Sequence, residues 1–245
     1  MLPNRKIIKY GDCEFIVFDK PDIISNAISH SGGHEKHLEE VSAKLIGDAI
    51  DGIVLDIGAN LGSYVIPVAK KFPQLKFISF EPQRIIYYQL CSNIILNGLD
   101  NVNAVNIALS DEAGVADTVI PDYFQETNIG AFSLDPEVRK NDYECATIGG
   151  KESMIISVLD NHNIGNIRLI KIDVEGLELK VLKGATQTLQ NNNYPPIIFE
   201  AWAYKEWFQS RRNELYDYIR SLGYNITIIG ENNIAQHSTK ENIVF

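Results

Sequence analysis

The fold is decided by the stretch VLDIGANLGSY, residues 54–64. Residues 54–57 are apolar apart from one acid, which is typical of a buried parallel strand. Gly58 and Gly62 then interrupt the strand, and a helical pattern begins at once. The glycines could serve close packing of the turn against the sheet. They could also serve a nucleotide-type ligand, because such a turn presents backbone N–H groups and the next helix adds its positive end.

Strand and helix patterns alternate along the rest of the chain. This alternation predicts an α/β fold with a doubly wound, mostly parallel sheet. Two closing strands with little helix between them predict a β-hairpin at one edge. Ligands of such sheets bind outside the carboxyl ends of the strands. The predicted strands span residues 7–19, 52–58, 75–82, 102–111, 168–176, 195–202, 224–230 and 241–245, and the predicted helices span 38–46, 63–71, 83–98, 178–190 and 210–222.

Two segments depart from this alternation. Residues 111–168 show turns and short alternating strands, which predict β-ribbons inserted over the sheet rather than a separate domain. Residues 1–30 contain short strands and a polar turn, and they are predicted to form an N-terminal segment of strands or a lid, whose role the sequence leaves open. Residues 31–245 are predicted to form one domain that includes the inserted ribbons.

The composition limits the classes of partner. The chain has 245 residues and a formal net charge of −10, which disfavours nucleic acid because phosphate binding requires a basic face. Apolar runs fall short of the roughly 18 residues of a membrane span, and the first residues show no signal core. We therefore expect a cytoplasmic protein without membrane contact. Cys13, Cys91 and Cys145 are widely spaced without a C-x-x-C motif, which indicates reduced thiols and no zinc knuckle.

Two acidic residues favour S-adenosylmethionine among the nucleotide-type ligands. The turn at residues 58–62 lacks the middle glycine of G-x-G-x-x-G, where a dinucleotide pyrophosphate approaches the backbone. Asp56 would repel a pyrophosphate, whereas it suits the amino group of a methionine moiety. Glu81 follows the next predicted strand, where a carboxylate accepts hydrogen bonds from both ribose hydroxyls. A solvated strand end is the structural alternative for Glu81.

Six motifs follow one another in the chain: VLDIGANLGSY, FEP, NVNAVNIALSDEAG, VLDNHNI, LIKIDVEGLELKVLKGA and IIFEAW. In this order and spacing they resemble the FkbM-type S-adenosylmethionine-dependent methyltransferases, from His34 to Trp202. The pattern KIDVEGxExxVLxGA is the most specific of them. The resemblance implies the class I methyltransferase fold, with a seven-stranded, Rossmann-like sheet. It also implies methyl transfer, largely to hydroxyl groups of polyketides, sugars and related metabolites.

The resemblance further implies which residues bind the cofactor. The loop after the first core strand would surround the methionine part, and Ser63 would start the helix that faces it. Glu81 would hold the ribose, and the end of the third strand would line the adenine pocket. The implied cofactor-binding residues are Asp56, Gly58, Asn60, Gly62, Ser63, Glu81, Ala108 and Leu109.

Methyl transfer to a hydroxyl requires an aligned nucleophile and a base for the hydroxyl proton. Asp173, Glu175 and Glu200 are candidates for this role because they follow two predicted strands. For Glu175 a helix start is the structural alternative, since acids are stabilised there. His34 is a further candidate base because imidazole titrates near neutral pH, and a solvated helix start is its alternative. The three carboxylates could also hold a divalent cation, but no metal site is predicted.

Other functions stay open from the sequence alone. One is methylation of nitrogen on an amino sugar, a protein or a nucleobase, and another is a non-catalytic, methyltransferase-like binding protein. The expected partner is a small-molecule or carbohydrate acceptor, and a homo-oligomer is compatible with the sequence. Aromatic residues after the fifth strand are predicted to pack together or to frame the acceptor pocket. They are Trp202, Tyr204, Trp207 and Phe208.

Overall fold

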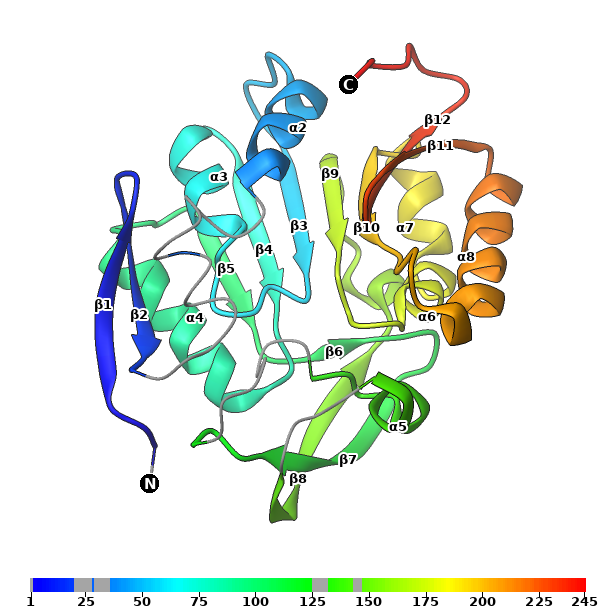
Figure 1. Cartoon of the computed structure of the whole chain (residues 1–245). Helices are drawn as coiled ribbons and strands as arrows, with labels where there is room; N and C mark the ends of the chain where they lie inside the picture. Colours follow the sequence, from blue (N-terminus) through cyan, green and yellow to red (C-terminus); the bar gives the residue numbers. More distant parts are fainter. Residues whose placement is uncertain (1, 20–27, 29–35, 125–131, 143–146) are drawn as a thin grey trace.

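The computed structural model describes residues 2–19, 28, 36–124, 132–142 and 147–245. A seven-stranded sheet in the order β11-β12-β10-β9-β3-β4-β5 forms its centre (Figure 1). Strands β5, β4, β3, β9 and β10 are parallel, and β12 runs antiparallel to both β10 and β11. The predicted sheet and its hairpin edge are therefore confirmed. The strands are β3 (Ile53–Ile57), β4 (Lys76–Phe80), β5 (Val102–Val105), β9 (Ile167–Ile172), β10 (Ile197–Glu200), β11 (Tyr224–Ile229) and β12 (Asn232–His237).

Helices cover both faces of this sheet (Figure 1). Val54 packs in one core cluster with residues of α2, α3 and α4, and Leu55 packs in the other with residues of α6, α7 and α8. Both faces of β3 are thus buried, which explains its apolar sequence. In the described ranges, no helix is long and apolar enough to span a membrane. The helices are α2 (Lys36–Ile46), α3 (Val65–Lys71), α4 (Arg84–Leu96), α5 (Pro136–Asp142), α6 (Glu178–Lys183), α7 (Thr186–Asn191) and α8 (Gln209–Ser221), with 3₁₀ turns η1 (Leu159–His162) and η2 (Glu206–Phe208).

The carboxyl ends of β3, β4, β9 and β10 lie at one edge of the sheet because these strands are parallel, and the strand order reverses between β3 and β9. Doubly wound folds bind their ligands at such an edge. A second sheet, of order β6-β8-β7, lies beyond this edge (Figure 1). It comprises β6 (Ala108–Leu109), β7 (Gly114–Pro121) and β8 (Thr147–Ser157), and it confirms the predicted inserted ribbons.

The N-terminal strands β1 (Arg5–Tyr10) and β2 (Cys13–Phe18) form an antiparallel hairpin that lies along α4 (Figure 1). Two side chains at α4 form hydrogen bonds with the edge of β2 that does not pair with β1. The Oδ1 atom of Asn93 accepts a hydrogen bond from the Ile16 N–H at 2.6 Å, and that of Asn97 accepts one from the Glu14 N–H at 3.0 Å. The predicted N-terminal strands are therefore present, and their role as a lid stays a prediction.

The third predicted strand, residues 102–111, is two strands in different sheets. β5 ends at Val105, and β6 begins at Ala108 and pairs with β8. Between them the side-chain amide of Asn106 donates hydrogen bonds to the carbonyl oxygens of Glu81 and Pro82, at 2.8 and 3.1 Å. These bonds hold the chain beneath the end of β4 and direct it out of the central sheet.

The predicted helix 178–190 is also interrupted, so that α6 and α7 are separate helices. A Cβ atom on Gly184 would lie 2.1 Å from the carbonyl oxygen of Ser110, so the break lies where the chain touches the β6 region. The Asp160 carboxylate then caps the new helix by accepting hydrogen bonds from the N–H groups of Gln187 and Thr188, at 3.0 and 2.7 Å. A contact distant in sequence therefore overrides the local helical pattern.

Residues 241–245 were predicted to be the last strand but form none, and the last strand of the sheet is β12. The Gln236 side chain instead forms hydrogen bonds with the backbone of this tail. Its amide nitrogen donates to the Ile243 carbonyl oxygen and its oxygen accepts from the Ile243 N–H, both at 2.9 Å. A side chain thus makes the two bonds that a neighbouring strand would have made.

Candidate active site

Acidic side chains gather at the carboxyl edge of the central sheet. Asp56 in β3 is fully buried, and Glu81, directly after β4, is 4% exposed. Asp173 follows β9 and Glu200 is the last residue of β10. Parallel strands end at the same edge, so residues far apart in the sequence become neighbours. The charges of Asp56 and Asp173, which are 25 and 92 positions from Glu81, both act on Glu81. The structure thus brings the carboxylates assigned from sequence to the cofactor close to those assigned to catalysis.

The turn after β3 satisfies its own backbone N–H groups. Those of Gly58 and Ala59 both donate to the Phe80 carbonyl oxygen at 3.0 Å. The Asn60 N–H donates to Glu81, and the N–H groups of residues 61 and 62 bond within the turn itself. A pyrophosphate needs such groups unbonded. The turn is therefore built to be rigid rather than to cradle phosphates.

Gly58 is required by the neighbouring strand end. Its φ is +86°, and a Cβ atom there would lie 1.7 Å from the backbone oxygen of Asp173. Asp173 in turn donates its N–H to the Ile57 carbonyl oxygen at 2.9 Å. Gly58 therefore has a packing role, and the close approach brings Asp173 against the turn; its role toward the cofactor stays a prediction. Asn60, at φ +51°, also has a left-handed conformation.

Glu81 connects two loops of the site. Its Oε2 accepts a hydrogen bond from the Asn60 N–H at 2.9 Å, and its Oε1 accepts one from the Gln83 N–H at 2.8 Å. Burial raises the pKa of Glu81 to about 7, and the charges of Asp56 and Asp173 add to the rise, while the two N–H groups oppose it. Each oxygen keeps one lone pair, which a ribose hydroxyl could use.

Lys171 is the site residue that sequence reasoning missed. It lies in β9 with its side chain 3% exposed, and its Nζ is 2.9 Å from the Oδ2 of Asp173. Across the sheet it is the register partner of Asp56, and its Nζ lies 5.4 Å from the ring centroid of Tyr64. Lysine is almost never fully buried unless it is paired. A lysine inside the apolar run LIKI was therefore the available signal.

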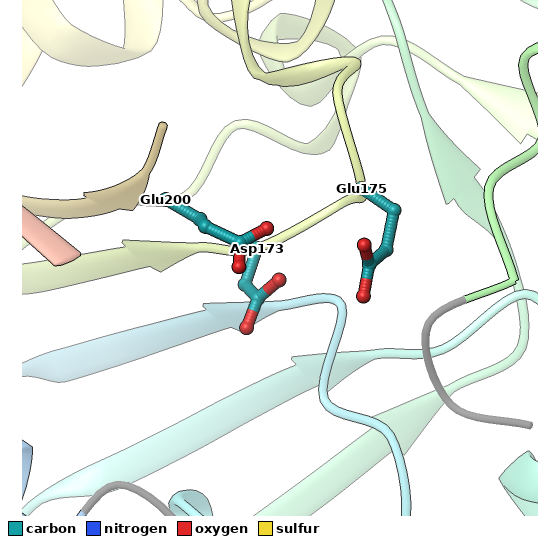
Figure 2. A group of neighbouring side chains, drawn as sticks. All are labelled: Asp173, Glu175 and Glu200. Carbon is teal, nitrogen blue, oxygen red and sulfur yellow. The ribbon is translucent and has the colours of Figure 1, made fainter. Parts of the chain in front are cut away.

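Asp173, Glu175 and Glu200 form a group of carboxylates that we call the acidic triad. One oxygen of each lies within 4.8 Å of the others. Figure 2 shows Asp173 and Glu200 at neighbouring strand ends and Glu175 on the turn that follows Asp173. Burial, and then the charges of Asp173 and Glu175, raise the pKa of Glu200 well above its ordinary value. The triad could bind a cation or accept hydrogen bonds from hydroxyl groups.

The structure places some of the other predicted site residues differently from the sequence prediction. Ser63 is 9% exposed and precedes α3, which begins two residues later than predicted, at Val65. Ala108 and Leu109 are buried in β6 rather than at the end of the third central strand, and Leu109 packs in a core cluster with Phe80. That placement was wrong because the chain leaves the sheet at Asn106, and their role toward adenine stays a prediction. His34 lies outside the described residues.

The aromatic residues after β10 pack mainly with one another. Trp202 and Phe208 are 3% and 2% exposed, with ring centroids 4.8 Å apart, and Val138 of α5 joins them in one cluster. Trp207 packs against this cluster, whereas Tyr204 is 70% exposed. The packing alternative therefore holds for Trp202 and Phe208, which support the wall behind the acidic triad rather than presenting their faces to a ligand.

Comparisons with known proteins agree with this architecture. The chain is 31% identical over 160 residues to methyltransferase sdnD of Sordaria araneosa, which covers 55% of this chain and 60% of that protein. It is 27% identical over 150 residues to hexuronic acid methyltransferase AglP of Haloferax volcanii, which covers 59% of this chain and 54% of that protein. The chain thus spans little more than half the length of these curated relatives.

The fold and the family follow from two further matches. The fold is similar to that of precorrin-6y C5,15-methyltransferase from Geobacter metallireducens GS-15, with a TM-score of 0.52 and 10% identity over 94% of this chain and 100% of that one. At such identity the likeness shows the class I methyltransferase fold and nothing finer. A family model described as the methyltransferase FkbM domain matches residues 56–226, which is most of the chain. The protein therefore belongs to the FkbM methyltransferase family.

Proposed function

We propose that this methyltransferase uses S-adenosylmethionine to methylate a hydroxyl group on a small-molecule, sugar or glycan acceptor. The observation that carries the proposal is the buried acidic edge. Asp56 and Glu81 are 0% and 4% exposed, and the acidic triad lies at the same strand ends. Lys171 balances one of these charges through its ion pair with Asp173. Burial and neighbouring carboxylates raise the pKa values of Glu81 and Glu200, so a cationic ligand beside them would be favoured.

S-adenosylmethionine suits these residues by its charge and by its lack of phosphate. Its sulfonium and ammonium groups are cations, and its diol matches the Glu81 carboxylate, whose two oxygens each retain a lone pair. The bonded turn at residues 58–62 supports the same choice, since it offers little to a pyrophosphate. Asp56, Gly58, Asn60, Gly62 and Ser63 would enclose the methionine part. Ala108 and Leu109 would line the adenine pocket.

When bound, the cofactor supplies a methyl group activated by the sulfonium. The chain's own residues then have to orient the acceptor and remove its proton. Asp173 is the proposed base, because it follows β9 next to the turn after β3 and Lys171 fixes one of its oxygens at 2.9 Å. Its other oxygen would accept the hydroxyl proton. Glu175 and Glu200 would accept hydrogen bonds from further hydroxyl groups, and His34 stays an alternative base.

The triad also favours a particular acceptor chemistry. Carboxylates accept hydrogen bonds from neighbouring hydroxyl groups, whereas a carboxylate on the acceptor would be repelled by them. A neutral, polyhydroxylated acceptor therefore fits better than an acidic one. The relative named for a hexuronic acid makes sugars the first class to test. An amino sugar is the second candidate, because the same acids would bind its ammonium group.

Calorimetry and mass spectrometry together test this proposal. We expect S-adenosylmethionine and S-adenosylhomocysteine to bind and NAD not to bind. In a panel of neutral methyl glycosides, hexuronic acids and amino sugars, we expect S-adenosylhomocysteine to form fastest with a neutral glycoside. Binding without turnover across the panel would support the non-catalytic alternative. Failure of both adenosyl ligands to bind would overturn the proposal.

A further inference from the structure

The turn that carries Glu175 has an unusual backbone. After β9 ends, Glu175 has a φ of +55° and Gly176 a φ of +92°. Glycine adopts this left-handed region readily, whereas a glutamate does so uncommonly and at a cost in free energy. The side chain that results joins the acidic triad, with an oxygen within 4.8 Å of those of Asp173 and Glu200 (Figure 2). The contacts of the peptide groups on either side of Glu175 therefore bear on where its carboxylate lies.

Glu178 provides such contacts from inside the fold. It is the first residue of α6 and is 1% exposed. One of its oxygens, Oε1, accepts hydrogen bonds from the N–H groups of Val174, at 3.0 Å, and Gly176, at 3.1 Å. These two N–H groups flank Glu175, so a single oxygen fixes the backbone before and after it.

The outer side of the turn is closed by the aromatic cluster. A Cβ atom on Gly176 would lie 3.0 Å from a methyl carbon of Val138 and 3.4 Å from ring atoms of Trp202 and Phe208. The turn therefore cannot swing outward without displacing buried side chains. The turn is therefore bordered by the aromatic cluster beside Gly176 and bonded to the Glu178 oxygen on both sides of Glu175.

We propose that Glu178 is a positioning residue, which holds the Glu175 carboxylate in the acidic triad where the acceptor's hydroxyl groups bind. The inference rests on the proposed function for the role of the triad. It differs from a purely local role at the start of α6, in which Glu178 would stabilise the helix and leave Glu175 unaffected. The two roles predict different behaviour when the Glu178 oxygen that accepts these hydrogen bonds is removed while the volume of the side chain is kept.

Two variants of the full chain separate these roles. Glu178→Gln removes the charge and keeps an oxygen that can accept from both N–H groups, whereas Glu178→Met fills the same space without such an oxygen. Amide hydrogen exchange of Val174 and Gly176 reports the clamp without any turnover. We expect protection in the wild type and in Glu178→Gln, and its loss in Glu178→Met. Equal protection in all three proteins would overturn the proposal.

A mutant cycle with Glu175 tests the functional part. For the acceptor found in the glycoside panel, we expect Glu178→Met to lower kcat by about 100-fold, the effect of a misplacement of about 1 Å, with unchanged affinity for S-adenosylmethionine. In a Glu175→Gln background the same change should lower kcat no further, because Glu178 acts through Glu175. An equal fall in both backgrounds would overturn the proposal. Absence of cofactor binding in the wild type would instead refute the proposed function and leave the exchange result readable.

Discussion

Lys171 and Asp173 form a buried ion pair between residues two positions apart at the end of β9, with an Nζ–Oδ2 distance of 2.9 Å. The lysine side chain is 3% exposed and the aspartate side chain 21%. Removing one partner of a buried pair leaves the other charge uncompensated, which is more costly than replacing both. The pair is therefore sensitive to single substitutions in a way that a surface pair is not.

We expect Lys171→Met to lower the free energy of unfolding by about 3 kcal/mol, at the lower end of the range for broken buried pairs because Asp173 is partly exposed. Urea unfolding measures this loss. The double variant Lys171→Met/Asp173→Asn removes both charges and should recover part of the stability. If the double variant were less stable than Lys171→Met, the ion pair would not be the cause.

The close approach of Gly58 to β9 predicts a position-specific cost for any side chain. Gly58→Ala should lower the free energy of unfolding by more than about 3 kcal/mol, because its Cβ atom would lie 1.7 Å from the Asp173 oxygen. Gly98→Ala is the matched control, since Gly98 has a φ of +65° and nothing within 4 Å of its Cβ position. It should cost only the roughly 1–2 kcal/mol of a left-handed alanine. Equal losses in the two variants would refute the close-contact explanation.

The Glu81 bridge predicts an effect on cofactor affinity. Glu81→Ala should weaken binding of S-adenosylmethionine by about 1–3 kcal/mol, the usual size for the loss of a hydrogen bond to a charged group. Calorimetry at fixed pH measures it. Glu214→Ala, which removes an exposed carboxylate on α8, should leave the affinity unchanged. An affinity of Glu81→Ala equal to that of the wild type would place the ribose elsewhere.

Two buried carboxyl groups predict how stability depends on pH. Burial raises the pKa of both Glu81 and Glu178 from 4.5 to about 7. In this range the folded protein binds more protons at these positions than the unfolded chain, so their contribution to the free energy of unfolding falls as the pH rises from about 4.5 to about 7. Urea unfolding across this range should show a flatter dependence for Glu81→Gln and for Glu178→Gln. An unchanged slope in these two variants would contradict the assignment.

The predictions from sequence succeeded where local pattern and chemistry coincide. Residues 54–64 show a strand, a glycine turn and a helix in immediate succession, and Glu81 and Asp173 directly follow apolar strands, so their shared edge could be inferred. The predictions failed where distant groups decide the local structure. The helix is interrupted at Gly184 by a contact with Ser110, which lies 74 positions earlier in the chain, so the local sequence pattern could not predict the break. Lys171 was missed because burial, and not residue type, makes it notable.

The acid-rich edge has a consequence for the end of the proposed reaction. Once the methyl group has left, the spent nucleoside is a neutral thioether at its centre, and the attraction of the surrounding acids for that atom disappears. The methylated and demethylated forms of the cofactor would thus differ in the charge that they place beside these carboxylates. The carboxylates would therefore bind the charged cofactor more tightly than its neutral product, which favours release of the product.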